Sequence, residues 1–242
     1  MKFGKRTIAT LITLITLITL IGAVSYTAED IPGDIALPDT IVERGLQNFK
    51  KQNTYKAGQF TDVATTEWYA ENVKTAYELG LVRGTSATTF KPTGNLTVAE
   101  AITLAARLHS IYYSGSDSFV QAGTWYQVYV DYALTFNIIS NNQFSDYNKA
   151  ATRAEFAKIF ANALPPEALE IINWVEDGSI PDVKLSDSYG PAVYYLYRVG
   201  ILTGNDKLGT FRPASTITRA EAAAIVTRMA DPSLRRNVTL AA

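Results

Sequence analysis

The sequence predicts an all-α protein in which one helix-loop-helix unit occurs three times. The tetrapeptide Thr-x-Ala-Glu appears at 97–100, 152–155 and 218–221, and each copy opens an alanine-rich stretch with helical periodicity. An aromatic residue followed by apolar residues at helical spacing precedes each tetrapeptide at a similar distance. A helix with one apolar stripe must bury that stripe against a neighbour, so the repetition predicts an array of packed repeats.

The first residues have the features of a secretory signal peptide. A basic start is followed by an apolar run over residues 8–21 and by small residues near Ser25. An uncleaved membrane anchor is the alternative, but the run is shorter than the ~18 residues that span a bilayer. We therefore expect residues 1–25 to be cleaved, which leaves a secreted protein with no stable membrane span.

The rest of the chain divides at its proline-containing stretches and at the repeat boundaries. Residues 26–57 are expected to form a linker with one short helix that Asp39 or Thr40 caps. The other expected segments are the first repeat (58–115), the second repeat (116–165), an insertion with a helical turn or two (166–179), the third repeat (180–231) and a C-terminal tail (232–242).

Each repeat begins with a short helix that ends at a residue suited to the left-handed conformation. In the first repeat, Val73 and Ala76 are spaced helically before Gly80. Gly200 holds this place in the third repeat and Asn137 in the second. A loop follows, with Phe-x-Pro in the first and third repeats. We expect its aromatic side chain to pack onto the core and its proline to block helix continuation.

The tetrapeptide predicts a capping box in all three copies, because its Thr and Glu can each bind the other's backbone amide. Its second position varies: it holds Val98, Arg153 and Arg219 in chain order. A cation at the first helical position is mildly unfavourable beside the helix dipole. An arginine near free helix amides suits a carboxylate or phosphate. Arg153 and Arg219 are therefore either solvated surface residues or anion ligands.

Two aspartates precede the first helices of the first and third repeats. Asp62 lies in Phe-Thr-Asp-Val and Asp182 in Ile-Pro-Asp-Val, whereas Phe119 takes this place in the second repeat. The favoured interpretation is that each aspartate anchors a turn or caps a helix. The alternative is that each one accepts hydrogen bonds from sugar hydroxyls or orients a nearby arginine.

Composition argues against several functional classes. With 22 basic and 23 acidic residues, the chain has no long-range attraction for nucleic acid or anionic membranes. It has no cysteine and a single histidine, His109, which we expect to be a partly buried helix residue. The repeated glutamates are accounted for as caps. We therefore expect no catalytic or metal-binding residue, no cofactor and no enzyme, with a cell-wall hydrolase as the less favoured alternative.

Taken together, the motifs Phe-x-Asp-Val, Trp-Tyr, Gly-Leu/Ile-x-x-Gly, Phe-x-Pro and Ile-Thr-Arg-Ala-Glu resemble the S-layer homology (SLH) domain. The resemblance covers residues 58–231 and is closest over 182–228. It implies three tandem SLH repeats in a pseudo-threefold, three-pronged helical bundle. It further implies a secreted bacterial protein of the cell wall or S-layer, anchored non-covalently to an anionic, pyruvylated secondary cell-wall polysaccharide through grooves between repeats.

The resemblance also implies which residues bind the ligand. Residues at eight positions match the family's motif: Arg153, Arg219, Asp62, Asp182, Trp68, Trp125, Gly84 and Gly204. An envelope protein scaffold or S-layer assembly partner, which would bind other envelope proteins, is the alternative function.

The repeats also depart from the family pattern. Val98 replaces the arginine in the first repeat, and Ser188 replaces the tryptophan in the third. The second repeat lacks the aspartate and has Asn137 and Asn141 at its two glycine positions. We therefore expect at most two anion sites.

Overall fold

A computed structural model describes residues 43–121 and 123–240 and shows an all-α fold within them. No strand forms in these ranges, and the extended segments meet only in isolated β-bridges. The signal peptide and the caps expected at Asp39 and Thr40 lie outside the described residues. The α-helices are α2 (Ala70–Glu78), α3 (Val98–Ser114), α4 (Gln127–Thr135), α5 (Arg153–Phe160), α6 (Gly190–Arg198) and α7 (Arg219–Ala230). Short 3-10 helices are η1 (Leu46–Asn48), η2 (Pro166–Ala168) and η3 (Pro232–Leu234).

The local signals at the helix ends are confirmed. Thr97, Thr152 and Thr218 each form a complete capping box with the glutamate three residues later. At the ends of the outer helices, Gly80, Asn137 and Gly200 have φ values of 73°, 57° and 74°. The loop aromatics are buried as expected, with Phe90, Phe144 and Phe211 inside the core.

The insertion between the second and third repeats contains less helix than expected. Only η2 is helical, and residues 171–175 are irregular. The amides of Ile172 and Asn173 both donate to the carbonyl of Arg198, at the end of α6. The Asn173 side chain donates to Tyr197 O at 2.9 Å. The segment thus donates hydrogen bonds to carbonyls at the end of α6 that have no partner within the helix. These bonds replace the helical hydrogen bonds that the segment would otherwise form within itself.

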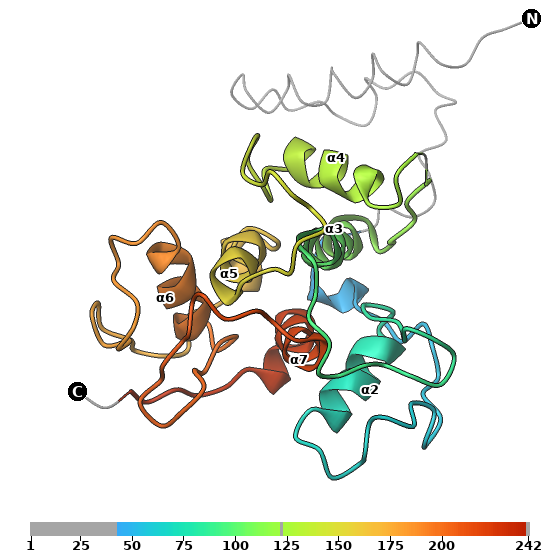
Figure 1. Cartoon of the computed structure of the whole chain (residues 1–242), viewed down its shortest axis with the longest axis horizontal. Coiled ribbons are helices and arrows are strands. Elements are labelled where there is room, and N and C mark those ends of the chain that lie inside the picture. The colour runs from blue at the N-terminus through green and yellow to red at the C-terminus, as the bar shows by residue number, and fades with distance from the viewer. Residues whose placement is uncertain (1–42, 122, 241–242) are drawn as a thin grey trace, which may run out of the picture. The chain divides into compact units, whose positions relative to one another are not determined.

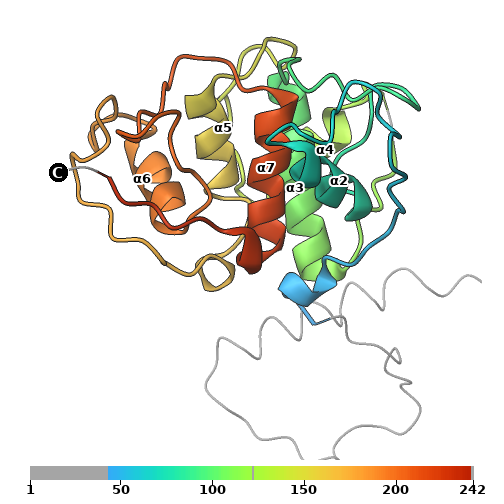
Figure 2. The same cartoon turned by 90° about the horizontal axis from the view of Figure 1, so that it is seen from below.

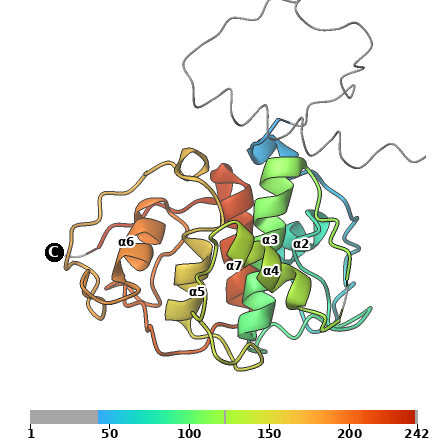
Figure 3. The ribbon, with the colours of Figure 1, turned by 90° about the horizontal axis from the view of Figure 1, so that it is seen from above.

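Each outer helix packs on the inner helix of the preceding repeat. Figure 1 shows α3, α5 and α7 grouped together, with α2, α4 and α6 outside them. The close pairs are α4 on α3, α6 on α5 and α2 on α7, so the first repeat packs on the third. Figures 2 and 3 show, from opposite sides, α3, α5 and α7 running side by side. Neighbouring repeats are therefore joined cyclically.

A ring of three backbone hydrogen bonds closes this cycle. Leu96, Ala151 and Ile217, the residues before the three capping threonines, occupy equivalent places. Leu96 N donates to Ile217 O, Ile217 N to Ala151 O and Ala151 N to Leu96 O, at 3.0, 3.1 and 2.8 Å. Since every repeat both donates and accepts, no repeat holds an end position in the ring. The three-pronged outline that the resemblance implies stays a prediction.

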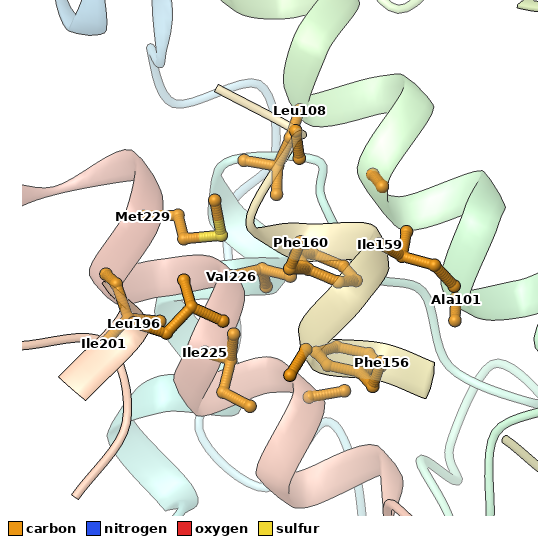
Figure 4. Packing of buried hydrophobic residues seen from close by; sticks show 14 of the residues in the cluster. Ala101, Leu108, Phe156, Ile159, Phe160, Leu196, Ile201, Ile225, Val226 and Met229 are labelled. Atoms are coloured by element: carbon orange, nitrogen blue, oxygen red, sulfur yellow. The ribbon is translucent and has the colours of Figure 1, made fainter. Parts of the chain in front are cut away.

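The core lies between the inner helices. Phe156 and Phe160 of α5 stack with ring centroids 4.0 Å apart. Figure 4 shows them close to Val226 and Met229 of α7, with Leu108 of α3 nearby. These side chains are almost completely buried, and burial of each contributes about 2 kcal/mol. Packing in this core sets the positions of the inner helices, and the tetrapeptide residues lie at the first turns of these helices.

Candidate functional site

Two of the cavities combine residues from all three repeats. The first, called groove A here, has a volume of about 380 Å³. It contains Trp68 from the first repeat, Arg153 from the second and Gly204 from the third. Glu221 and Arg228 of the third repeat complete its charged lining.

The second cavity, groove B, repeats this combination one step around the ring. It has a volume of about 170 Å³ and contains Trp125 of the second repeat, Arg219 of the third and Gly84 of the first. Glu100 and Arg107 provide the charges that Glu221 and Arg228 provide in groove A, and the exposed Arg83 adds a cation where groove A has Thr203. An adjoining cavity of about 500 Å³ extends groove B past Gln121 and Tyr129.

The sequence departures fall together in the third combination. One further step around the ring would join Ser188 of the third repeat, Val98 of the first and Asn141 of the second. The tryptophan, the arginine and the loop glycine are thus all replaced at one interface. By the cyclic order of the repeats, replacements that lie far apart in the sequence are thus expected at one interface, and two complete combinations remain.

Arg153 is buried inside groove A and is held by the third repeat. Its Nε donates to Phe211 O at 2.7 Å, and its Nη1 donates to Glu221 Oε1 at 2.6 Å. The guanidinium lies 5.1 Å from the centroid of the Phe211 ring. The side chain is only 7% exposed. Arg153 is therefore not a solvated surface residue, and it joins two repeats as well as lining the cavity.

Arg219 makes the corresponding contacts in groove B. Its Nε donates to Phe90 O at 2.7 Å, and its Nη2 donates to Arg83 O at the same distance. Its Nη1 lies 3.9 Å from Oε1 of Glu100, a looser ion pair than that of Arg153. Burial lowers the pKa of Arg219, although Glu100 and Asp62 partly oppose this. The second arginine is thus less firmly paired than the first.

The helix amides beside these arginines are not free, which corrects one part of the anion hypothesis. The amides of Arg153 and Ala154 donate to Ser215 O and Pro213 O, and that of Arg219 donates to Gly94 O. The neighbouring repeat therefore satisfies these helix starts, and Thr at the cap accepts from the next free amide. Because of this packing, only side chains are left to bind an anion here.

The third interface places a lysine where the other two place an arginine. Lys149 Nζ lies 2.5 Å from Glu155 Oε1. Glu155 occupies the place of Glu100 and Glu221, whose Oε1 atoms face arginines of the preceding repeat. Val98 cannot supply that cation, so the second repeat neutralises its own glutamate.

Asp62 and Asp182 line neither groove and instead hold the loops behind them. Asp182 accepts from the amides of Phe211 and Arg212 at 2.8 and 2.6 Å. Asp62 accepts from the equivalent amides of the first repeat at 2.8 and 2.7 Å. Arg212 has a φ of 61°, so the carboxylate stabilises an unfavourable left-handed residue. These contacts support the interpretation of the aspartates as turn anchors.

The loop glycines are required for different reasons. A Cβ at Gly84 would meet the carbonyl oxygens of Ser86 and Thr89 and the ring of Phe60. Gly204 has a φ of 81°, where any L side chain is strained, and a Cβ there would meet the backbone of Gly209. Both glycines therefore shape the groove walls through close backbone approach.

Comparison with protein families identifies the repeated unit. The family model for the S-layer homology domain matches residues 59–102 and 179–223. The chain carries S-layer homology domains. The matched segments lie in the first and third repeats. The second repeat, where the SLH pattern departs most, nevertheless has the same capping box and the same place in the hydrogen-bonded ring.

Proteins similar to this chain include a cell wall protein, a surface-layer protein and two enzymes, all much longer than this chain. The middle cell wall protein of Brevibacillus brevis is 31% identical over 136 residues, which is 56% of this chain and 12% of that protein. An endoglucanase of a Bacillus species is 27% identical over 187 residues, which is 75% of this chain and 19% of the enzyme. The surface-layer 125 kDa protein of Lysinibacillus sphaericus is 28% identical over 140 residues, or 53% and 12%.

Sequence reasoning missed a second pair of arginines in the SLH grooves. Arg228 Nη1 donates to Ile201 O at 2.8 Å in groove A. In groove B, Arg107 binds the equivalent carbonyl of Leu81 and also forms an ion pair with Asp117. Both arginines lie two helical turns beyond the capping glutamate. Alignment of the inner helices to their ends, rather than only to the tetrapeptide, would have revealed them.

His109 is a structural residue of the first SLH repeat, as expected. It is buried on α3, and its Nδ1 lies 2.9 Å from the hydroxyl of Tyr132. Burial lowers its pKa to about 4. Within residues 43–121 and 123–240, no cluster of His, Asp and Glu is arranged to bind a metal ion. Among the helices of the same ranges, none is both long and apolar enough to cross a membrane.

Proposed function

We propose that this chain anchors non-covalently to the bacterial cell envelope by binding an anionic, pyruvylated secondary cell-wall polysaccharide in grooves A and B. The observation that carries the proposal is the shared make-up of the grooves. Each contains a tryptophan, an arginine and a loop glycine from three different repeats. These residues lie far apart in the sequence, and their joint replacement at the third interface indicates that they act as a set.

The groove residues suit an acidic sugar. Trp68 and Trp125 are 61% and 50% exposed. Side chains this accessible contribute little to packing of the hydrophobic core. An exposed indole offers a flat apolar face for a sugar ring, with a polar edge beside it. The arginines are cations that attract a carboxylate, although two nitrogens of each already donate to protein oxygens. A pyruvyl ketal supplies such a carboxylate on a sugar.

Family membership and relatives support a location at the cell surface. One relative is named as a cell wall protein and another as a surface-layer protein. The matched part is a small share of each relative's length, so the functions of their other parts are not transferred to this chain. The proposed location is the cell wall or S-layer of a bacterium.

Two other functions make different predictions. The endoglucanase relative raises the possibility of a cell-wall hydrolase, which would release reducing sugar from purified walls. A protein scaffold would bind envelope proteins but not protein-free wall polymer. An anchor would sediment with protein-free walls and release no sugar.

The test is sedimentation of the chain with purified, protein-free cell walls before and after removal of the secondary polymer. We expect binding only while the polymer is present. The double variant Arg153→Ala and Arg219→Ala is expected to bind weakly, because both grooves lose their shared arginine. Sedimentation that persists after polymer removal would contradict the proposal, and so would unchanged binding by a folded double variant.

A further inference from the structure

The two grooves differ in how their second arginine is neutralised. In groove B, Asp117 accepts from both Nε and Nη2 of Arg107. In groove A, Arg228 has no carboxylate within 4.0 Å among the described residues. It donates only to a neutral carbonyl, that of Ile201. Two equivalent arginines thus have opposite electrostatic surroundings.

The surroundings of Arg228 disfavour its positive charge. Burial, with a smaller effect of the nearby cation Arg236, lowers the pKa of Arg228 to about 10. A partly desolvated cation without a counter-ion gains more from an arriving anion than a solvated or paired cation does. Arg228 also lines a cavity of about 380 Å³, which has room for a ligand.

The other arginine of groove A is already committed. Arg153 donates to Glu221 Oε1 at 2.6 Å, and Glu221 itself lines the cavity. A carboxylate ligand beside Arg153 would therefore also meet the negative charge of Glu221. The unbalanced positive charge of groove A is thus located at Arg228.

We propose that Arg228 is the residue through which groove A binds the carboxylate of an acidic sugar, and that the equivalent Arg107 of groove B does not play this part because Asp117 neutralises it. This inference rests on the proposed function. It assigns charge recognition to the second arginine, at the end of the inner helix, and leaves Arg153 chiefly to join the repeats. Groove B has Arg219 and the exposed Arg83 as its other cations.

The test compares two small probes by calorimetry: a pyruvyl-ketal N-acetylhexosaminide and its neutral methyl ester. We expect wild-type protein to prefer the acid, and Arg228→Gln to reduce that preference roughly tenfold, the loss of one charged hydrogen-bonding partner. Arg228→Lys should keep part of the preference. The matched control is Lys207→Gln, which removes an exposed cation from the same repeat outside the cavity and should leave the preference unchanged.

A second variant guards against loss of binding through misfolding. Asp117→Asn should free Arg107 and increase the preference of the protein for the acid probe, an effect that damage to the fold cannot produce. The inference is overturned if wild-type protein shows no preference for the acid. It is also overturned if folded Arg228→Gln keeps the preference, if Lys207→Gln reduces it equally, or if Asp117→Asn does not increase it.

These outcomes separate the inference from the proposed function. Binding of the acid probe through Arg228 without sedimentation on walls would contradict anchoring and support the anion site. If the chain sediments only with polymer-bearing walls, and neither Arg228→Gln nor Asp117→Asn changes this, the result would support anchoring and contradict the anion site.

Discussion

Arg153 donates from Nη1 to Glu221 Oε1 at 2.6 Å and thereby joins the second repeat to the third. The other oxygen of Glu221 accepts from the amide of Thr218 at 2.8 Å. One carboxylate thus closes a helix cap and neutralises a buried arginine. In the second repeat, Glu155 closes the same cap but pairs with a half-exposed lysine of its own repeat.

This difference predicts unequal costs for the same substitution. Glutamine can still accept from the cap amide, so Glu221→Gln mainly removes the charge beside Arg153. We expect it to lower the free energy of unfolding by about 2–3 kcal/mol, since it leaves a buried cation without a counter-ion. Glu155→Gln should cost about 1 kcal/mol or less, because Lys149 can turn to solvent. Urea denaturation of both variants measures the difference, and equal costs would contradict it.

The three tryptophans predict a separation of binding from stability. Trp68→Ala and Trp125→Ala should each weaken cell-wall binding roughly fivefold or more, about 1 kcal/mol, while changing the melting temperature little. Trp174, which is 87% exposed in the insertion and lines neither groove, provides the matched control. Sedimentation assays measure the binding. A Trp174→Ala variant as weak as the other two would argue against the grooves.

The loop glycine Gly84 predicts a steric loss of stability on substitution that is larger than the loss at Gly94. Gly84→Ala would place a Cβ against two backbone carbonyl oxygens, so we expect a loss of about 2 kcal/mol or more. At Gly94, the nearest atom to an added Cβ is Lys91 O at 3.2 Å, so Gly94→Ala should cost less. Thermal unfolding compares the two variants, and a smaller loss for Gly84→Ala would be inconsistent with the backbone geometry.

His109 predicts a pH dependence with a definite sign. Its pKa is about 4 in the folded chain and ordinarily 6.5, so the unfolded state binds the extra proton between these values. Its contribution to stability is therefore complete above pH 6.5 and is lost as the pH falls toward 4. Because the ring is not fully desolvated, with 8% of the residue still exposed, we expect a contribution of roughly 1–2 kcal/mol.

The measurement compares the wild type with His109→Phe at pH 7.5 and pH 4.5. The variant should lose less stability on acidification, because it lacks the group that gains a proton on unfolding. Carboxylates titrate in both proteins, so only the difference between the two losses reports on His109. An equal or larger loss in the variant would show that His109 is not the group responsible.

Features that depend on nearby residues were predictable from the sequence. A capping box spans three positions, and a left-handed helix end needs one glycine or asparagine, so both appeared in all three repeats. The insertion was harder, because residues 171–175 are bound to the distant end of α6 rather than to one another. Its apolar spacing alone suggested more helix than the single turn at η2.

The all-α class, the threefold repetition and the residue types that we propose for binding were all predictable from the sequence. Which of those residues meet depends on how the helices pack. Trp68, Arg153 and Gly204 come from three repeats and share a cavity because each outer helix packs on the preceding inner helix. The same packing occupied the helix amides, buried Arg153 and left Arg228 without a carboxylate partner among the described residues. Capping and periodicity act over a few positions, whereas the charge of a groove depends on contacts between distant parts of the chain.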